Sequence, residues 1–385
     1  MSTLYVIQAA DYSGAETAQL PVLRADPEAL VACPAGSRTE ALVRDAGART
    51  VPLRFRVMRH SGGLLTLARS VPAGLRSARE LRVLLRAQPE RRVVYGTSLR
   101  PSLLAAVAAL GLRRRTVWVL TDFMPPGALG SMIRSLAAAT RPRVVAHSSA
   151  IAASFAAGRK RLADLVTVVH PAVDIEHFAA VAPLAGVPRV GVFGHISPTK
   201  RTDLAVEVAA RLPEAQFEIV GAAQYREEDF AFEQALRRRV ADDPDLAARV
   251  RFRGRLEDIR GALGDVSVVL HCRADEPFGM VLVEAMAAGR PVVAPAAAGP
   301  LEIVEHGVTG LLYPPGDAGA AAARVSALLA DPARARAMGR AARAAAIERF
   351  GAERHNRRIA QLLMGSSRRE APVIQVPAAQ HQGEI

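Results

Sequence analysis

The chain alternates short apolar segments with helical ones, and the alternation restarts once. Helices are expected between the strands of the first half, as at 74–86 and 101–110. The predicted strands there are residues 4–8, 29–33, 50–52, 92–95, 116–120, 143–146 and 166–169. Strands that alternate with helices at this spacing indicate a parallel, doubly wound sheet. The next segment, 180–188, is small, uncharged and proline-bearing, so we expect a linker there.

A second unit of the same kind follows the linker. Its predicted strands are residues 189–193, 216–220, 251–254, 267–272, 291–294 and 310–313. Residues 318–364 are mostly Ala, Arg and Leu, which predicts helix. Because 385 residues exceed one ordinary core, two α/β domains are expected. The predicted organisation is a domain at 1–180, a domain at 189–350, an amphipathic helix at 351–364 and a disordered tail at 365–385.

Cysteine content and hydropathy bear on the compartment. The only two cysteines, Cys33 and Cys272, lie far apart, which argues against a disulfide framework and fits a reducing compartment. The first residues show no basic segment followed by an apolar one, so no signal peptide is predicted. The longest apolar run, 101–112, is shorter than the roughly 20 residues of a membrane span and is expected to be a buried helix. We therefore expect a cytoplasmic protein.

Positive charge is concentrated in the first half. Residues 1–180 hold 24 Lys and Arg against 12 Asp and Glu, whereas residues 181–385 hold 26 against 25. Such a half fits an anionic ligand, a membrane surface, nucleic acid, or a solvated surface without a partner. One expected helix bears Arg76, Arg79, Arg82 and Arg86, and it either lies on an anionic membrane or packs into the core with a charged outer face.

The most informative motif is E-P-F-G-M-V-L-V-E, residues 276–284, directly after a predicted strand. A short helix is expected to begin near Met280. The backbone N–H groups of Phe278, Gly279 and Met280 would then lie at a helix N-terminus, where phosphate binds. Gly279 has no Cβ to obstruct a close approach. Glu276 and Glu284 are carboxylates that can accept hydrogen bonds from sugar hydroxyls.

A second motif, G-V-F-G-H-I-S-P-T-K-R at 191–201, follows the first strand of the second unit. A glycine turn at Gly194 with a nearby cation is suited to a diphosphate. The cation is Lys200, one of only two lysines among 50 basic residues, the other being Lys160. A solvated basic turn is the alternative interpretation.

Both motifs resemble those of retaining GT-B glycosyltransferases of family 4. The two glutamates match the family's Glu, seven residues, Glu pattern, and Lys200 matches the lysine of its Gly-Arg-x-x-x-x-Lys-Gly segment. His195 stands where the family has Arg, and Arg201 where it has Gly, so either could complete the phosphate clamp. Residues 298–312 are similar to the loop and strand that follow the glutamate motif in the family.

The first half resembles the family more loosely. Ser13-Gly14-Ala15-Glu16 is similar to a Gly-Gly-Ala-Glu loop that lies against the donor in relatives, although a plain strand-to-helix turn would also explain it. Asp122 ends a strand where relatives read His-Asp, but Thr121 replaces the His, so only Asp122 is expected near the acceptor.

The resemblance implies a GT-B fold, in which two doubly wound Rossmann-like domains face each other across a cleft. It implies a nucleoside-diphosphate sugar donor, UDP or GDP foremost, with Glu284 on the ribose. Glu276 would contact the sugar, while Lys200, with His195 or Arg201, and the N–H groups near Gly279 would hold the diphosphate. Catalysis is expected on the front face, with retention of configuration and without metal or cofactor.

The expected acceptor is a hydroxyl compound, anionic or lipid-linked if the basic domain contacts it, and the same domain could contact a membrane peripherally. The expected catalytic residues are Glu276, Lys200 and Asp122. Two alternatives stay open. One is a nucleotide-sugar epimerase of the same fold, and the other is an Arg-rich nucleic-acid-binding protein. An aromatic content of 4% argues against the stacking that single-stranded nucleic acid requires.

Overall fold

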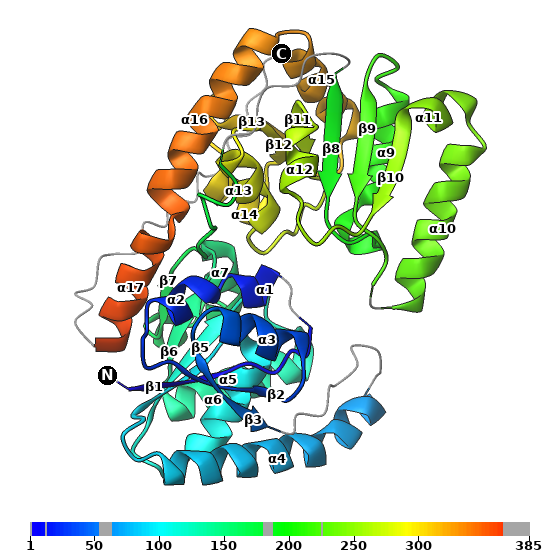
Figure 1. Ribbon diagram of the computed structural model, residues 1–385. Coiled ribbons are helices and arrows are strands. Elements are labelled where there is room, and N and C mark those ends of the chain that lie inside the picture. Colours follow the sequence, from blue (N-terminus) through cyan, green and yellow to red (C-terminus); the bar gives the residue numbers. More distant parts are fainter. Residues whose placement is uncertain (1, 12–13, 54–63, 180–187, 225, 365–385) are drawn as a thin grey trace.

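The structure is a computed structural model that describes residues 2–11, 14–53, 64–179, 188–224 and 226–364. The predicted tail and all of the predicted linker except Pro188 lie outside the described residues. Two parallel sheets, each covered by helices, lie one beyond the other along the molecule (Figure 1). This confirms the predicted fold class.

All seven strands predicted in the first half are present and form one parallel sheet in the order β3-β2-β1-β4-β5-β6-β7. They are β1 Thr3–Val6, β2 Leu30–Pro34, β3 Arg49–Leu53, β4 Val93–Gly96, β5 Arg115–Leu120, β6 Arg143–Ala146 and β7 Val166–Val168. The central strands β1 and β4 are buried at every position, since helices cover both faces of the sheet.

The helices of this domain are α1 Gly14–Thr17, α2 Leu20–Arg24, α3 Arg38–Asp45, α4 Leu64–Ala87, α5 Leu99–Ala109, α6 Gly127–Thr140, α7 Ser149–Ala156 and α8 Lys160–Ala163. Helix α4 contains the Arg-rich segment for which two interpretations were open. Its Leu81 and Leu85 are fully buried against the sheet, and the Arg82 guanidinium donates to the Ala108 carbonyl at 3.0 Å. The helix therefore packs into the core. No helix among the described residues combines the length and apolarity needed to cross a membrane.

The second sheet contains the six predicted strands in the order β10-β9-β8-β11-β12-β13, all parallel. They are β8 Arg189–Phe193, β9 Gln216–Val220, β10 Val250–Gly254, β11 Val268–Leu270, β12 Val292–Pro295 and β13 Gly310–Tyr313. Strand β8 pairs with β9 on one side and with β11 on the other. The strand order reverses there, and ligands of open α/β sheets bind at the carboxyl side of such a point.

The helices of this second part are the single 3₁₀ turn η1 Pro198–Lys200, α9 Thr202–Ala210, α10 Glu227–Ala241, α11 Pro244–Arg249, α12 Arg260–Gly264, α13 Met280–Ala287, α14 Ala298–Ile303 and α15 Ala318–Leu329. The predicted helical segment 318–364 is divided into α15, α16 Pro332–Phe350 and α17 Ala352–Met364. Asp331 is the N-cap of α16, and its Oδ1 accepts a hydrogen bond from the Arg334 N–H at 2.9 Å.

Helices α16 and α17 run along one side of both domains (Figure 1). Although α17 follows the second domain in sequence, its Ile359 and Leu362 are buried in a core cluster of the first domain. The Asn356 amide donates to the Pro21 carbonyl at 3.0 Å. The C-terminal helix therefore returns to the first domain and packs against it.

Candidate active site

A pocket lies at the carboxyl ends of β8, β9 and β11, where the order of the second sheet reverses. Its lining comes from the ends of β8, β9 and β11 and from the segment between β8 and α9. It comprises Val192, Phe193, Gly194, His195, Lys200, Thr202, Ile219, Leu270, His271 and Cys272. The glycine turn of the second motif thus borders the pocket. Gly194 has φ 136°, and the backbone of Gly221 approaches it so closely that a Cβ at Gly221 would lie 1.8 Å from the Gly194 oxygen.

Lys200 and Glu276 meet beside this pocket. The Lys200 Nζ lies 2.7 Å from the Glu276 Oε2, although the two residues are 76 positions apart in the chain. Lys200 ends η1, which Ser197 caps by accepting from the Lys200 N–H at 3.3 Å. Burial acts to raise the pKa of Glu276, but the Lys200 ammonium and His271 outweigh it and hold the pKa well below its usual range. The Glu276 carboxylate is therefore ionised at neutral pH.

His271 is a site residue that the sequence analysis missed. It directly follows β11, is 5% exposed, and places its Nε2 3.3 Å from the Glu276 Oε2. The Tyr313 hydroxyl donates to the His271 carbonyl at 2.8 Å, which fixes the backbone of this position. The available signal was its place at the carboxyl end of a strand, one residue beyond the last buried β-position and five before Glu276.

Glu284 lies on α13 and is half-buried, and its carboxyl has no hydrogen-bond or ion-pair partner among the described residues. Burial raises the pKa of its carboxyl to about 7. A buried carboxyl without a partner is costly in its charged form. A ligand that donates hydrogen bonds to this group would therefore stabilise its ionised form.

The residues between the two glutamates have different roles in the structure. Gly279 is the N-cap of α13 with φ 111°, a conformation that favours glycine. The Leu282 N–H donates to the Gly279 carbonyl at 3.0 Å, so the N–H groups of Met280 and Val281 precede the first bond of the helix. Met280 lies next to Gly14 of the first domain, since a Cβ at Gly14 would be 3.5 Å from the Met280 Cγ. The Phe278 side chain is 4% exposed and packs on the His170 ring, with 5.5 Å between centroids. Only the backbone of Phe278 is thus left for a ligand.

The structure separates the two candidates for the second half of the phosphate clamp. His195 borders the pocket with Lys200, and burial, followed by the Lys200 charge, lowers its pKa. Arg201 instead has its Nε 3.1 Å from an oxygen of Asp203 and is 43% exposed. His195 is therefore a neutral hydrogen-bonding group that borders the pocket with Lys200, and the Arg201 charge is compensated by Asp203 at the start of α9.

Asp122 is not brought to the Lys200–Glu276 pair by any contact among the described residues. It is exposed two residues after β5 and accepts from the N–H of Phe123 at 2.8 Å. Ser13 and the side chain of Ala15 lie outside the described residues. Asp243 is the N-cap of α11, and its Oδ1 accepts from the Asp245 N–H at 3.0 Å.

Known proteins resemble this chain in sequence and in fold. Residues 174–345 match the model of the family described as Glycosyl transferases group 1. D-inositol 3-phosphate glycosyltransferase of Kribbella flavida is 35% identical over 196 residues, which are 46% of this chain and 46% of that protein. The lipopolysaccharide core biosynthesis glycosyltransferase LpsE of Rhizobium meliloti is 31% identical over 147 residues, 38% of this chain and 41% of that protein. The chain thus matches about half the length of these curated relatives.

Solved structures extend the likeness over both domains. HepE of Anabaena, in complex with UDP-glucose, superposes with a TM-score of 0.80 at 26% identity and covers 95% of this chain and 100% of that one. Sucrose-phosphate synthase of Thermosynechococcus elongatus gives a TM-score of 0.76 at 20% identity, with the same coverage. The fold is therefore that of GT-B glycosyltransferases. The match to the Glycosyl transferases group 1 model lies in residues 174–345, which include the Lys200 and Glu276 motifs.

Proposed function

We propose that this protein transfers a glycosyl group from a nucleoside-diphosphate sugar, UDP foremost, to a hydroxyl acceptor, with retention of configuration and without a metal. The main support is the 2.7 Å contact between Lys200 and Glu276, which joins the two strongest motifs at the reversal point of the second sheet. An ammonium for phosphate and a carboxylate for sugar hydroxyls thus lie side by side.

The donor is proposed to lie along the carboxyl edge of the second sheet. An ammonium has three donors, and Lys200 uses one on Glu276, which leaves two for phosphate oxygens. The N-terminus of α13 at Gly279 adds N–H groups and a favourable dipole for the diphosphate. Glu284 lies roughly one and a half turns into the same helix. Its carboxylate would accept hydrogen bonds from the ribose hydroxyls.

In the proposed reaction the acceptor oxygen attacks the anomeric carbon on the face from which the diphosphate departs. The bond between that carbon and the diphosphate oxygen breaks, and the acceptor proton passes to the departing phosphate oxygen. Negative charge accumulates on the diphosphate, where Lys200 and the α13 N-terminus would stabilise it. Glu276 would orient the sugar through its hydroxyls, so no protein carboxylate needs to act as a nucleophile.

The choice of donor and acceptor to test follows from the relatives and from the charge of this chain. HepE of Anabaena binds UDP-glucose, and the Kribbella protein is named for D-inositol 3-phosphate. An excess of Lys and Arg over residues 1–180 would attract a phosphorylated acceptor. We therefore propose a UDP-sugar donor and an anionic acceptor, with D-inositol 3-phosphate as the first compound to test.

A thermal-shift panel of UDP, GDP, ADP and dTDP tests the donor site. A ligand at about 100 times its Kd should stabilise the folded state by about 2.7 kcal/mol, so UDP is expected to raise the Tm most. Glu284→Gln should reduce that shift. If none of the four nucleotides raises the Tm, the proposed function is wrong.

Incubation with UDP-glucose alone separates transfer from epimerisation. A transferase should form glycoside only when an acceptor is added, whereas an epimerase of this fold would convert the donor sugar at C2 without one. Accumulation of the C2 epimer in the absence of acceptor would favour the epimerase.

A further inference from the structure

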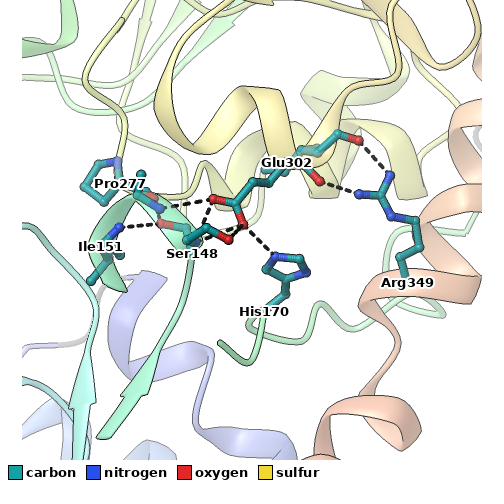
Figure 2. Close-up of polar contacts among 9 residues, drawn as sticks. Ser148, Ile151, His170, Pro277, Glu302 and Arg349 are labelled. Atoms are coloured by element: carbon teal, nitrogen blue, oxygen red, sulfur yellow. Dashed lines mark hydrogen bonds and ion pairs between the residues drawn. The ribbon is translucent and has the colours of Figure 1, made fainter. Parts of the chain in front are cut away.

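Two residues of the first domain bind the second domain at the N-terminus of α7. Ser148 caps α7 by accepting from the Ile151 N–H at 3.1 Å, and its hydroxyl donates to the Pro277 carbonyl at 2.5 Å (Figure 2). The next N–H group, of Ser149, donates to both carboxylate oxygens of Glu302, at 2.7 and 3.0 Å. A carboxylate of the second domain therefore occupies the helix N-terminus of the first, where negative charge is favoured.

Glu302 is held from several sides. His170 of the first domain places its Nε2 3.0 Å from the Glu302 Oε2 (Figure 2). On the second-domain side, the Arg349 guanidinium donates to the backbone carbonyls of Glu302 and Ile303. Burial acts to raise the pKa of Glu302, but His170 and the Ser149 N–H outweigh it and lower the pKa. Glu302 is thus an ionised, mostly buried carboxylate at the domain boundary.

The same contacts reach the loop of Glu276. Pro277, which accepts from Ser148, is the residue next to Glu276. The Gly299 N–H at the start of α14 donates to the Glu276 carbonyl at 3.0 Å. A Cβ at Gly299 would lie 2.2 Å from the Phe278 oxygen, so the two backbones are in direct contact. The Glu276 loop and the helix of Glu302 are therefore one packed unit.

We propose that Glu302 and Ser148 are positioning residues, which fix the Glu276 loop against the first domain so that the donor sugar faces the acceptor. Neither residue approaches the Lys200–Glu276 pair directly, and both act through the backbone of 277–279 and through α14. The inference rests on the proposed function, because the sugar and the acceptor are what the loop would align.

The test compares full-length Glu302→Gln and Ser148→Ala with the unchanged protein. Glu305→Gln is the matched control, since Glu305 lies three residues away, is exposed, and makes its hydrogen bonds through its backbone. Ser148→Thr is the conservative variant that keeps the hydroxyl. The measurements are amide hydrogen exchange over 276–287, the Kd of UDP by calorimetry, and kcat and KM for UDP release from UDP-glucose in the presence of D-inositol 3-phosphate as acceptor.

In Glu302→Gln and Ser148→Ala, exchange over 276–287 should rise roughly tenfold, with distant segments unchanged, because local opening becomes easier. The kcat should fall roughly tenfold or more, as expected for a misplaced reacting group, while the Kd of UDP stays within about twofold. Ser148→Thr should restore both readouts, and Glu305→Gln should match the unchanged protein.

Unchanged exchange over 276–287, or exchange that rises equally throughout both domains, would overturn the positioning role. A kcat that is unchanged while exchange rises locally would also overturn it. A failure of the unchanged protein to bind UDP would instead reject the proposed donor, and the exchange measurement would still decide whether Glu302 fixes the loop.

Discussion

At the residue scale, the side-chain nitrogens of Lys200 and His271 both lie close to the same carboxylate oxygen of Glu276. Lys200 Nζ and His271 Nε2 approach Oε2 at 2.7 and 3.3 Å. The structure gives Oε1 no hydrogen bond within the described residues, so this oxygen is left for a ligand. A bound diphosphate would compete with Glu276 for the Lys200 ammonium, and His271 would then be the neighbour that stays with the carboxylate.

Removal of the Lys200 charge should impair turnover strongly. Lys200→Ala is expected to lower kcat/KM for the UDP-sugar by roughly 100-fold or more, the scale of one preorganised charge contact at a leaving group. Steady-state kinetics measure the change. Lys160→Ala is the matched control, because Lys160 is the other lysine of the chain and lies exposed on α8. Near-normal turnover of Lys200→Ala would remove this residue from the site.

Glu284→Gln should stabilise the free protein while weakening nucleotide binding. The folded-state pKa of Glu284 is raised to about 7, so ionisation costs stability as the pH rises from the unfolded-state value through 7. The variant avoids that cost, and its unfolding free energy should exceed that of the unchanged protein by about 1 to 3 kcal/mol at about pH 8, with a much smaller gain at about pH 5. Urea denaturation at the two pH values measures it.

The same substitution should weaken UDP binding, although it stabilises the free protein. If the ribose donates to the Glu284 carboxylate, Glu284→Gln should raise the Kd of UDP. In the unchanged protein UDP should bind more weakly as the pH falls through 7, because the carboxyl becomes protonated. A UDP affinity that neither the substitution nor the pH alters would contradict the ribose role.

At the scale of elements, the loop after β11 and the helix after β12 act as one piece because they share a backbone contact. Gly299 permits it, since the carbonyl and Cα of Phe278 lie 2.2 and 2.5 Å from the place a Cβ would take. The glycine is therefore required by packing, and its φ is ordinary.

Gly299→Ala should force these two backbones apart. We expect it to destabilise the protein by roughly 1 to 3 kcal/mol or more, the cost of overpacking a tight contact, and to reduce turnover through Glu276. Gly261→Ala in α12 is the control, since no atom lies within 4 Å of its added Cβ, and Ala there should be neutral or slightly stabilising. Denaturant unfolding compares them, and equal stabilities would refute the steric argument.

At the scale of the whole molecule, the chain crosses from one domain to the other more than once. Helix α17 returns to the first domain, and Val173 N–H donates to the Phe350 carbonyl at 3.0 Å where α16 ends. Phe278 and Phe350 pack edge to face on each other, and both rings contact His170. The boundary near Glu302 is thus continuous with the hydrophobic cores of the molecule.

Helix α17 should contribute to stability through its buried face. Leu362→Ala is expected to cost about 2 to 5 kcal/mol, because the side chain is 4% exposed in the core of the first domain. Met364→Ala, at 59% exposure on the same helix, should change stability by less than about 0.5 kcal/mol. Thermal unfolding measures both, and a similar loss for the two variants would show that burial of α17 is not the cause.

The sequence predicted the strands well because each is a short apolar run between turn residues, and both sheets contain every strand expected. Helices were predicted less completely. The helices at 38–45, 127–140 and 227–241 had not been singled out. His271, Ser148 and Glu302 were missed as functional candidates because their significance depends on their side-chain partners. His271 meets Glu276, five residues later, across a turn. Ser148 and Glu302 have partners 129 and 153 positions away.

By itself the sequence determined the two parallel sheets, since the alternation of apolar strands and helices permits few other arrangements. It also located Lys200 and Glu276, because glycine turns and charged residues directly after strands are local features. Only the tertiary structure decided that these two side chains touch, that Arg201 is compensated by Asp203, and that Glu302 binds the other domain. Contacts between distant segments depend on how the sheets and helices pack, and no local pattern of residues encodes that geometry.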